Sequence, residues 1–139
     1  MKQVVVHPER CVGCMQCVPA CATAHSRTGQ LFTAIMETPL PRSRVHVGAG
    51  LIGEGFPNRC RHCDPPDCKD AADEFVKGAI IQDKCGAVIF TEKIKKIDPD
   101  GIDEILSACP YEIPRYDPET RMIYKCNFCL DRINSGLTP

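Results

Sequence analysis

The sequence has no tryptophan, and aromatic residues make up only 6% of its 139 residues. A chain this short and this poor in large apolar side chains builds only a small core, so we expect cross-links to stabilise it. The sequence also lacks any apolar run near the ~20 residues that a membrane helix needs. We therefore predict one compact domain, or two very small ones sharing a core, with no membrane span.

An excess of charge of either sign is also absent. Lys and Arg number 17 against 18 Asp and Glu, and the resulting net charge of −1 gives no basic footprint for a nucleic-acid partner. The N-terminus leads straight into the short run Val4-Val5-Val6, without the apolar region of a secretory signal. These features predict a soluble protein of a reducing compartment, the cytoplasm.

Cysteine is the residue in excess, with 11 among the 139 residues. Disulfides are one explanation, but the odd number of cysteines and the lack of a secretory signal disfavour them. The cysteines also fall into groups with the close spacing that is typical of metal ligands. We therefore interpret these groups as ligands of metal centres.

The first group, Cys11, Cys14, Cys17 and Cys21, has the spacing C-x2-C-x2-C-x3-C. Three thiolates this close together fit one face of a cubic iron–sulfur cluster, and the fourth points to a second cluster. Zinc prefers two separated C-x2-C pairs that close one tetrahedron, which this stretch fits poorly. The motif therefore predicts [4Fe-4S] binding.

Later cysteines supply further candidate ligands. They are Cys60, Cys63 and Cys68 with the spacing C-x2-C-x4-C, Cys109 before Pro110, and Cys126 and Cys129 as a C-x2-C pair. These six and the four of the first group are the predicted cluster ligands. Cys85 has no cysteine at a chelating offset, and we interpret it as a spare thiol on a loop.

The same spacing rule identifies positions where ligands are missing. The fourth position of the second group holds Ala72, and the three positions before Cys109 hold Pro99, Ile102 and Ile105. All four would have served a single cluster, because the last cysteine of one motif binds the cluster of its partner motif. Their joint loss predicts that this cluster has been replaced and that the partner site keeps all its ligands.

An apolar helix is the predicted replacement. Asp98 is a suitable N-cap, Pro99 a suitable first residue, and Ile102, Ile105 and Leu106 share one face. Apolar side chains at these positions avoid leaving a void or unpaired buried thiolates.

The two outer motifs each lack one ligand. Cys11, Cys14 and Cys17 need a fourth from the last motif, and the set formed by Cys126, Cys129 and Cys21 also needs one more. Either something else completes these two clusters, or both missing cysteines lie just after Pro139. We favour the second explanation and expect the chain to continue past that residue. It would then carry about three [4Fe-4S] clusters.

Local patterns predict a few further elements. Two short apolar runs at residues 78–81 and 87–90 predict a hairpin. Residues 2–7 and the alternating residues 42–47 predict strands, and residues 48–57, with four glycines, predict a loop.

The four motifs together resemble the polyferredoxin electron-transfer subunits that accompany molybdenum and tungsten oxidoreductases, hydrogenases and carbon monoxide dehydrogenases. The matching stretches are HPERCVGCMQC at 7–17, CRHCDPPDC at 60–68, ACPY at 108–111, PRYD at 114–117 and KCNFCLDR at 125–132. The N-terminal stretch is most similar to the carbon monoxide dehydrogenase partner. It also resembles small subunits of tungsten enzymes of the aldehyde oxidoreductase type, including class II benzoyl-CoA reductase.

The resemblance implies an α+β fold with two ferredoxin-like halves of short strands and helices around [4Fe-4S] clusters. Residues 1–30 with 115–139 would form one half of this single compact polyferredoxin, and residues 55–114 the other. The family usually carries four clusters, and the departures at Ala72, Pro99, Ile102 and Ile105 reduce the number to three.

The resemblance also implies a function in anaerobic metabolism. The protein would pass single electrons between a large catalytic subunit, containing tungsten or molybdenum, and an external donor or acceptor. It would not itself be an enzyme, since its four histidines show no ligand spacing with carboxylates. A free-standing ferredoxin and a zinc-binding interaction module stay open as alternatives.

Overall fold

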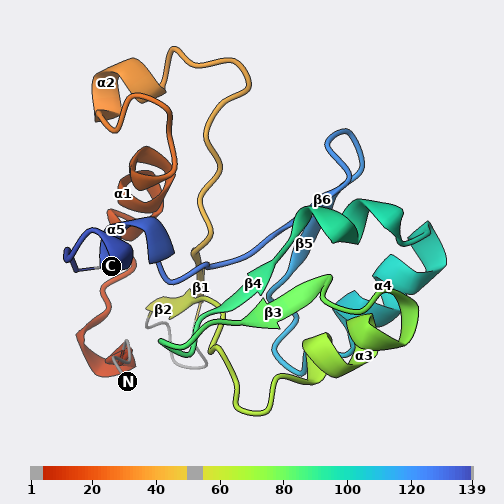
Figure 1. The fold of residues 1–139 in the computed structure, drawn as a ribbon. Helices are drawn as coiled ribbons and strands as arrows, with labels where there is room; N and C mark the ends of the chain where they lie inside the picture. Colours follow the sequence, from red (N-terminus) through yellow and green to blue (C-terminus); the bar gives the residue numbers. More distant parts are fainter. Residues whose placement is uncertain (1–4, 50–54, 139) are drawn as a thin grey trace. The chain divides into compact units, whose positions relative to one another are not determined.

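The computed structural model describes residues 5–49 and 55–138, which form short helices and three two-stranded antiparallel sheets (Figure 1). They divide into two compact units, an N-terminal unit that ends at Arg59 and a C-terminal unit that begins at Cys60. This mixture of short helices and short strands agrees with the predicted α+β class. None of the helices within the described ranges is both long and apolar enough to span a membrane.

The N-terminal unit contains three short helical segments and one sheet. Its elements are the 3-10 helix η1 (Pro8–Arg10), α1 (Cys17–Ala24), α2 (Leu31–Ala34), β1 (His46–Ala49) and β2 (Gly55–Asn58). The segment between α1 and α2 is fixed by Glu37. The carboxylate of Glu37 accepts hydrogen bonds from the amides of Arg27 at 3.1 Å and Thr28 at 3.0 Å.

The strands of this unit differ from those predicted. The strand expected at 42–47 begins only at His46, and part of the segment expected as a loop forms the β1–β2 pair, in which Ala49 lies opposite Gly55. Val5, Val6 and His7 form no strand, and residues 2–4 of that predicted strand lie outside the described residues. Glycine weakens the local strand signal, but it is tolerated where another backbone comes close, as happens at Gly55.

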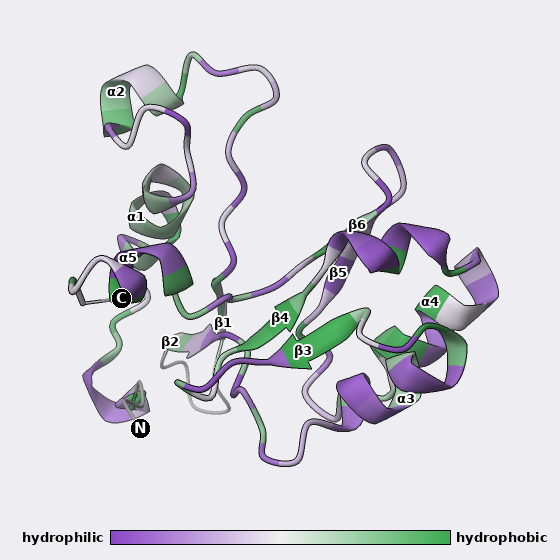
Figure 2. Ribbon diagram, viewed as in Figure 1, coloured by the Kyte–Doolittle hydropathy of each residue, from purple (hydrophilic) through white to green (hydrophobic). Residues whose placement is uncertain are grey.

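The C-terminal unit contains most of the secondary structure. Its elements are α3 (Asp67–Phe75), β3 (Ile80–Gln82), β4 (Val88–Phe90), the 3-10 helix η2 (Glu92–Lys96), α4 (Pro99–Ser107), β5 (Arg115–Asp117), β6 (Met122–Tyr124) and α5 (Leu130–Asn134). The predicted hairpin at 78–90 is confirmed by the antiparallel pairing of β3 with β4, in which Ile81 lies opposite Ile89. Figure 2 shows β3 and β4 among the hydrophobic parts of this unit.

One hydrophobic core stabilises the C-terminal unit, where α3 and α4 lie side by side (Figure 1). Its buried members are Ala72, Ala79, Ile80, Val88, Ile94, Ile97, Ile102, Ile105 and Ile123. Isoleucine dominates because the sequence has few aromatic residues to fill the interior.

The predicted helix before Cys109 is confirmed. The Asp98 carboxylate accepts a hydrogen bond from the Gly101 amide at 2.8 Å, and Pro99 is the first residue of α4. Ile102 and Ile105 are 1% and 0% exposed. Ala72 is also fully buried, so three of the four positions at which the spacing rule finds no ligand belong to the core. The fourth, Pro99, lies at the surface.

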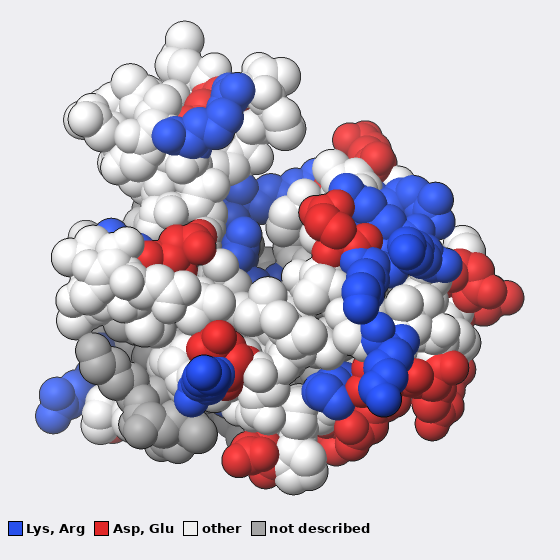
Figure 3. Space-filling view, viewed as in Figure 1, with Lys and Arg blue, Asp and Glu red and all other residues white. Residues whose placement is uncertain are grey.

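The surface of the C-terminal unit carries a basic segment at η2. Lys93, Lys95 and Lys96 are exposed there, and Figure 3 shows Lys and Arg side chains gathered over this part of the unit. Lys95 pairs with Glu92 at 2.5 Å. Exposed pairs of this kind contribute little to stability. The exposed lysines make this segment a solvated face of the unit.

Candidate metal centre

The three C-x2-C loops share one backbone feature. The residue before the second cysteine has a positive φ in each loop, 67° at Gly13, 52° at His62 and 62° at Phe128. A left-handed backbone is readily adopted by glycine but costs other residues about 1–3 kcal/mol. The surrounding structure therefore holds His62 and Phe128 in the conformation that shapes their loops.

In two of these loops the turn directs a backbone amide to a cysteine sulfur. The His62 amide donates a hydrogen bond to Cys60 Sγ at 3.4 Å, and the Phe128 amide donates one to Cys126 Sγ at 3.4 Å. Hydrogen bonds to sulfur stabilise the negative charge of a cluster and influence its reduction potential. The two loops thus offer donors where a cluster ligand would need them.

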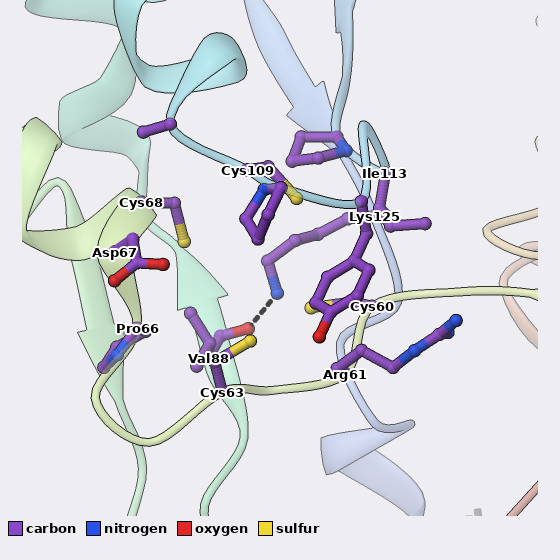
Figure 4. A pocket seen from close by; sticks show the side chains of 14 residues that line it. Cys60, Arg61, Cys63, Pro66, Asp67, Cys68, Val88, Cys109, Ile113 and Lys125 are labelled. Atoms are coloured by element: carbon purple, nitrogen blue, oxygen red, sulfur yellow. Dashed lines mark hydrogen bonds between the residues drawn. The ribbon is translucent and has the colours of Figure 1, made fainter.

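The second and third cysteine groups meet in one pocket of the C-terminal unit (Figure 4). Cys60 and Cys63 lie in the loop before α3, Cys68 lies in the first turn of α3, and Cys109 follows α4. Most of the remaining wall is apolar, and its residues are Pro66, Val88, Ala108, Pro110, Ile113 and Pro114, with Arg61, Asp67, Tyr111 and Lys125. The structure therefore brings together the four thiols predicted to form one complete site.

The β3–β4 hairpin anchors the loop that carries Cys60 and Cys63. Gln82 Nε2 donates a hydrogen bond to the Cys63 carbonyl at 3.3 Å, and the Val88 amide donates one to His62 Nδ1 at 3.0 Å. Both anchors come from strands of the core. The position of the loop therefore depends on the packing of the hairpin.

Burial raises the pKa of two of the thiols in this pocket. It raises the pKa of Cys68 to about 11, against an opposing effect of Lys125 and with a further rise from Cys60. Burial also raises the pKa of Cys63, again with a contribution from Cys60. A thiol in such surroundings becomes a thiolate when a metal replaces its proton. Four thiols gathered against a largely apolar wall fit an iron–sulfur cluster, in which each thiolate binds an iron atom.

The pocket differs from a site for one metal ion. Within residues 5–49 and 55–138, no three His, Cys, Asp or Glu side chains are arranged to hold a single ion. The ligands of a zinc ion all lie about 2.0–2.3 Å from it, whereas each ligand of a cubic cluster binds a different iron atom.

The first cysteine group lies in the N-terminal unit. Cys11 and Cys14 lie in the loop after η1, Cys17 begins α1, and Cys21 lies one turn further along that helix. Cys14 and Cys17 are exposed, and Cys21 Sγ accepts a hydrogen bond from the Arg44 amide at 3.3 Å. The loop and helix thus carry all four predicted ligands within one short stretch of backbone.

Strand β2 packs directly against the loop that carries Cys11 and Cys14. The Gly55 amide donates a hydrogen bond to the Cys11 carbonyl at 3.2 Å. A Cβ atom on Gly55 would lie 2.7 Å from Cys11 Sγ and 2.8 Å from the Gly13 backbone. Only glycine fits at this position without displacing the loop. The one local signal for this requirement is that Gly55 belongs to a glycine-rich segment.

The last cysteine pair follows β6. Cys129, with a φ of 46°, precedes α5, and its amide donates a hydrogen bond to Asn127 Oδ1 at 3.1 Å. The Phe128 ring lies edge to face with the His62 ring, with 5.2 Å between their centroids. The grouping of Cys126 and Cys129 with Cys21 in one cluster stays a prediction.

Cys85 lies in the turn between β3 and β4. Its amide donates a hydrogen bond to Asp83 Oδ1 at 3.0 Å, and its side chain is partly exposed. It does not line the pocket of the four thiols. The interpretation of Cys85 as a spare thiol stays a prediction.

Two family models match the sequence. Residues 53–139 match a 4Fe-4S dicluster domain, and residues 4–21 match a 4Fe-4S binding domain. The two matches include all the cysteines predicted as ligands. They agree with the predicted cofactor and not with the alternative of zinc.

Known proteins are similar over nearly the whole chain. The formate dehydrogenase 2 subunit beta (cytochrome c-553) of Nitratidesulfovibrio vulgaris is 36% identical, and the match covers 99% of this chain and 69% of that protein. The formate dehydrogenase subunit beta of Megalodesulfovibrio gigas is 35% identical, with the same coverage of 99% and 69%. The formate dehydrogenase-O iron-sulfur subunit of Escherichia coli is 30% identical over 93% of this chain and 45% of its own length.

Proposed function

The chain belongs to the family of 4Fe-4S dicluster domains, and we propose that it transfers electrons to or from a formate dehydrogenase-type catalytic subunit. Its relatives are iron–sulfur subunits, and like them it is an electron-transfer subunit and not a catalytic one. The observation that carries the proposal is the convergence of Cys60, Cys63, Cys68 and Cys109 on one pocket. A cluster bound there supplies reversible one-electron chemistry.

The number of clusters is part of the proposal. One cluster would be held by the four thiols of the pocket. Two more would be held by Cys11, Cys14 and Cys17 and by Cys21, Cys126 and Cys129, each set with one further ligand, giving about three [4Fe-4S] clusters. The apolar packing of Ala72, Ile102 and Ile105 supports the absence of a fourth, since it leaves no space for one in the core.

The contact between His62 and Phe128 supports an order for the electron path. These residues belong to the Cys60–Cys63 loop and the Cys126–Cys129 loop, and their ring centroids are 5.2 Å apart. Because the two loops touch through these rings, no further residue has to carry the electron from one loop to the other. We infer that electrons pass between the clusters of these loops, and that the lost cluster site lay at one end of the path.

The relatives favour formate as the substrate of the catalytic partner, since their names state formate dehydrogenase. Whether that partner contains tungsten or molybdenum stays a prediction, as does the similarity to tungsten aldehyde-oxidoreductase subunits. The external redox partner and the cytoplasmic location are likewise predictions.

Anaerobic co-purification tests the proposal. The chain is expressed with its formate-oxidising large subunit, and iron, sulfide and subunit composition are measured after size exclusion. The expected result is a stable complex with about four iron atoms for each cluster, whose visible absorption is bleached by formate.

Two results would contradict the proposal. Zinc in place of iron and sulfide would indicate the interaction module. A chain that carries clusters but elutes alone, and that formate does not reduce in the presence of the large subunit, would indicate a free-standing ferredoxin.

A further inference from the structure

One cation lies inside the pocket of the four thiols. Lys125 directly follows β6, its side chain lines the pocket, and the residue is only 5% exposed. Figure 4 shows its Nζ among the sulfur atoms of the labelled cysteines. A lysine buried to this degree is uncommon unless its charge is compensated.

Among the described residues, two backbone carbonyls and one aromatic ring compensate this charge. Lys125 Nζ donates hydrogen bonds to the carbonyl of Val88 and, at 3.1 Å, to that of Cys126. It also lies 5.4 Å from the centroid of the Phe90 ring. Asp67 lines the same pocket but is exposed, and among the described residues no carboxylate forms an ion pair with Lys125.

An anion is therefore expected next to Lys125. Burying a charge without an opposite charge costs several kcal/mol even after the surroundings relax. Four thiolates bound to iron would give the pocket a net negative charge and supply that anion.

We propose that the positive charge of Lys125 raises the reduction potential of the cluster held by Cys60, Cys63, Cys68 and Cys109. Reduction transfers one electron from a neighbouring cluster or an external donor, with no bond broken and no proton moved. The reduced cluster carries one more negative charge than the oxidised one, so a nearby fixed cation stabilises it more. This inference rests on the proposed ligand set.

Lys125 also has a structural role that the test must separate from its charge. Its bonds to Val88 and Cys126 connect β4 to the last cysteine loop across 37 residues of sequence. A purely structural lysine would affect folding or cluster retention. It would not selectively move the potential of one cluster that is otherwise fully assembled.

Anaerobic redox titration followed by EPR tests the proposal in the complex with the large subunit. The variants are Lys125→Met, which keeps the length and apolar stem, and Lys125→Gln, which keeps a donor for a carbonyl. Lys96→Met, at an exposed position of η2, is the matched control. Iron and sulfide are measured in every sample, and the signal of the pocket cluster is the one that a Cys68→Ala/Cys109→Ala variant lacks.

The expected result is a reduction equilibrium at least tenfold less favourable for that cluster in both Lys125 variants. This corresponds to a potential lower by about 59 mV or more for a one-electron couple. The other clusters and Lys96→Met should keep their potentials. An unchanged potential with full iron content, an equal shift of all clusters, or loss of iron from both variants would overturn the proposal. Absence of iron from the unmodified protein would instead overturn the proposed function.

Discussion

The rings of His62 and Phe128 lie edge to face, with centroids 5.2 Å apart and an angle of 62° between their planes. Each residue precedes the second cysteine of its C-x2-C loop, and each has a left-handed backbone. The two loops are 66 residues apart in sequence when counted from Cys60 to Cys126, yet they meet through equivalent positions (126 − 60 = 66). This contact is the structural basis for proposing direct electron transfer between their clusters.

Replacing Phe128 by leucine tests the importance of this contact. The substitution keeps an apolar side chain but removes the ring pair, which contributes about 0.5–1.5 kcal/mol. We expect full iron content with a weaker magnetic interaction between the two reduced clusters, seen as less broadening in the EPR spectrum. Phe75→Leu, at the end of α3, is the control and should leave the spectrum unchanged. An unaltered spectrum for Phe128→Leu would show that the ring pair does not set the distance between the loops.

Gly55 should be essential for the first cysteine loop. An alanine there places Cβ within 2.7 Å of Cys11 Sγ, so the loop or the strand must move. We expect Gly55→Ala to lose about four iron atoms per chain, one cluster, measured by iron analysis after anaerobic purification.

Gly48 gives the matched control for Gly55. It lies in β1 opposite Phe56, and a Cβ on it would meet nothing within 4 Å. Gly48→Ala should therefore keep the full iron content. Equal iron contents in the two variants would mean that β2 does not support the loop closely.

The core around α4 should behave like an ordinary hydrophobic core. Ile105 is fully buried, and Ile105→Ala should lower the free energy of unfolding by about 2–5 kcal/mol through lost burial and a residual cavity. The measurement is the denaturant midpoint followed by circular dichroism under anaerobic conditions. Ile81→Ala, at a β3 position that is 44% exposed, should have a much smaller effect. Similar midpoints for the two variants would contradict the packing described for α4.

Much of the C-terminal unit follows from local signals in the sequence. The N-cap of Asp98, the proline after it and the spacing of Ile102 and Ile105 all act within one or two helical turns, and α4 has the predicted form. The β3–β4 hairpin is equally local. The set of four thiols was predictable because the spacing of ligands reflects the geometry of the cofactor.

Other features depend on contacts between distant residues and had no local signal. Lys125 looked like an ordinary charged residue, and only the fold places its Nζ against the carbonyl of Val88. Strand β2 and the second half of β1 were predicted as a loop because their glycines weaken the pattern, although Gly55 is required by the closeness of Cys11. The backbone conformations of His62 and Phe128 likewise follow from their surroundings, since a positive φ is uncommon for every residue type except glycine.

The central claim is that Cys60, Cys63, Cys68 and Cys109 hold one [4Fe-4S] cluster of an electron-transfer subunit. Iron and sulfide analysis of a Cys68→Ala/Cys109→Ala variant, purified anaerobically beside Cys85→Ala, tests it most directly. We predict that the double variant loses about four iron atoms per chain relative to the unmodified protein, while Cys85→Ala loses none. Full iron content in the double variant, or the same loss in Cys85→Ala, would contradict the claim.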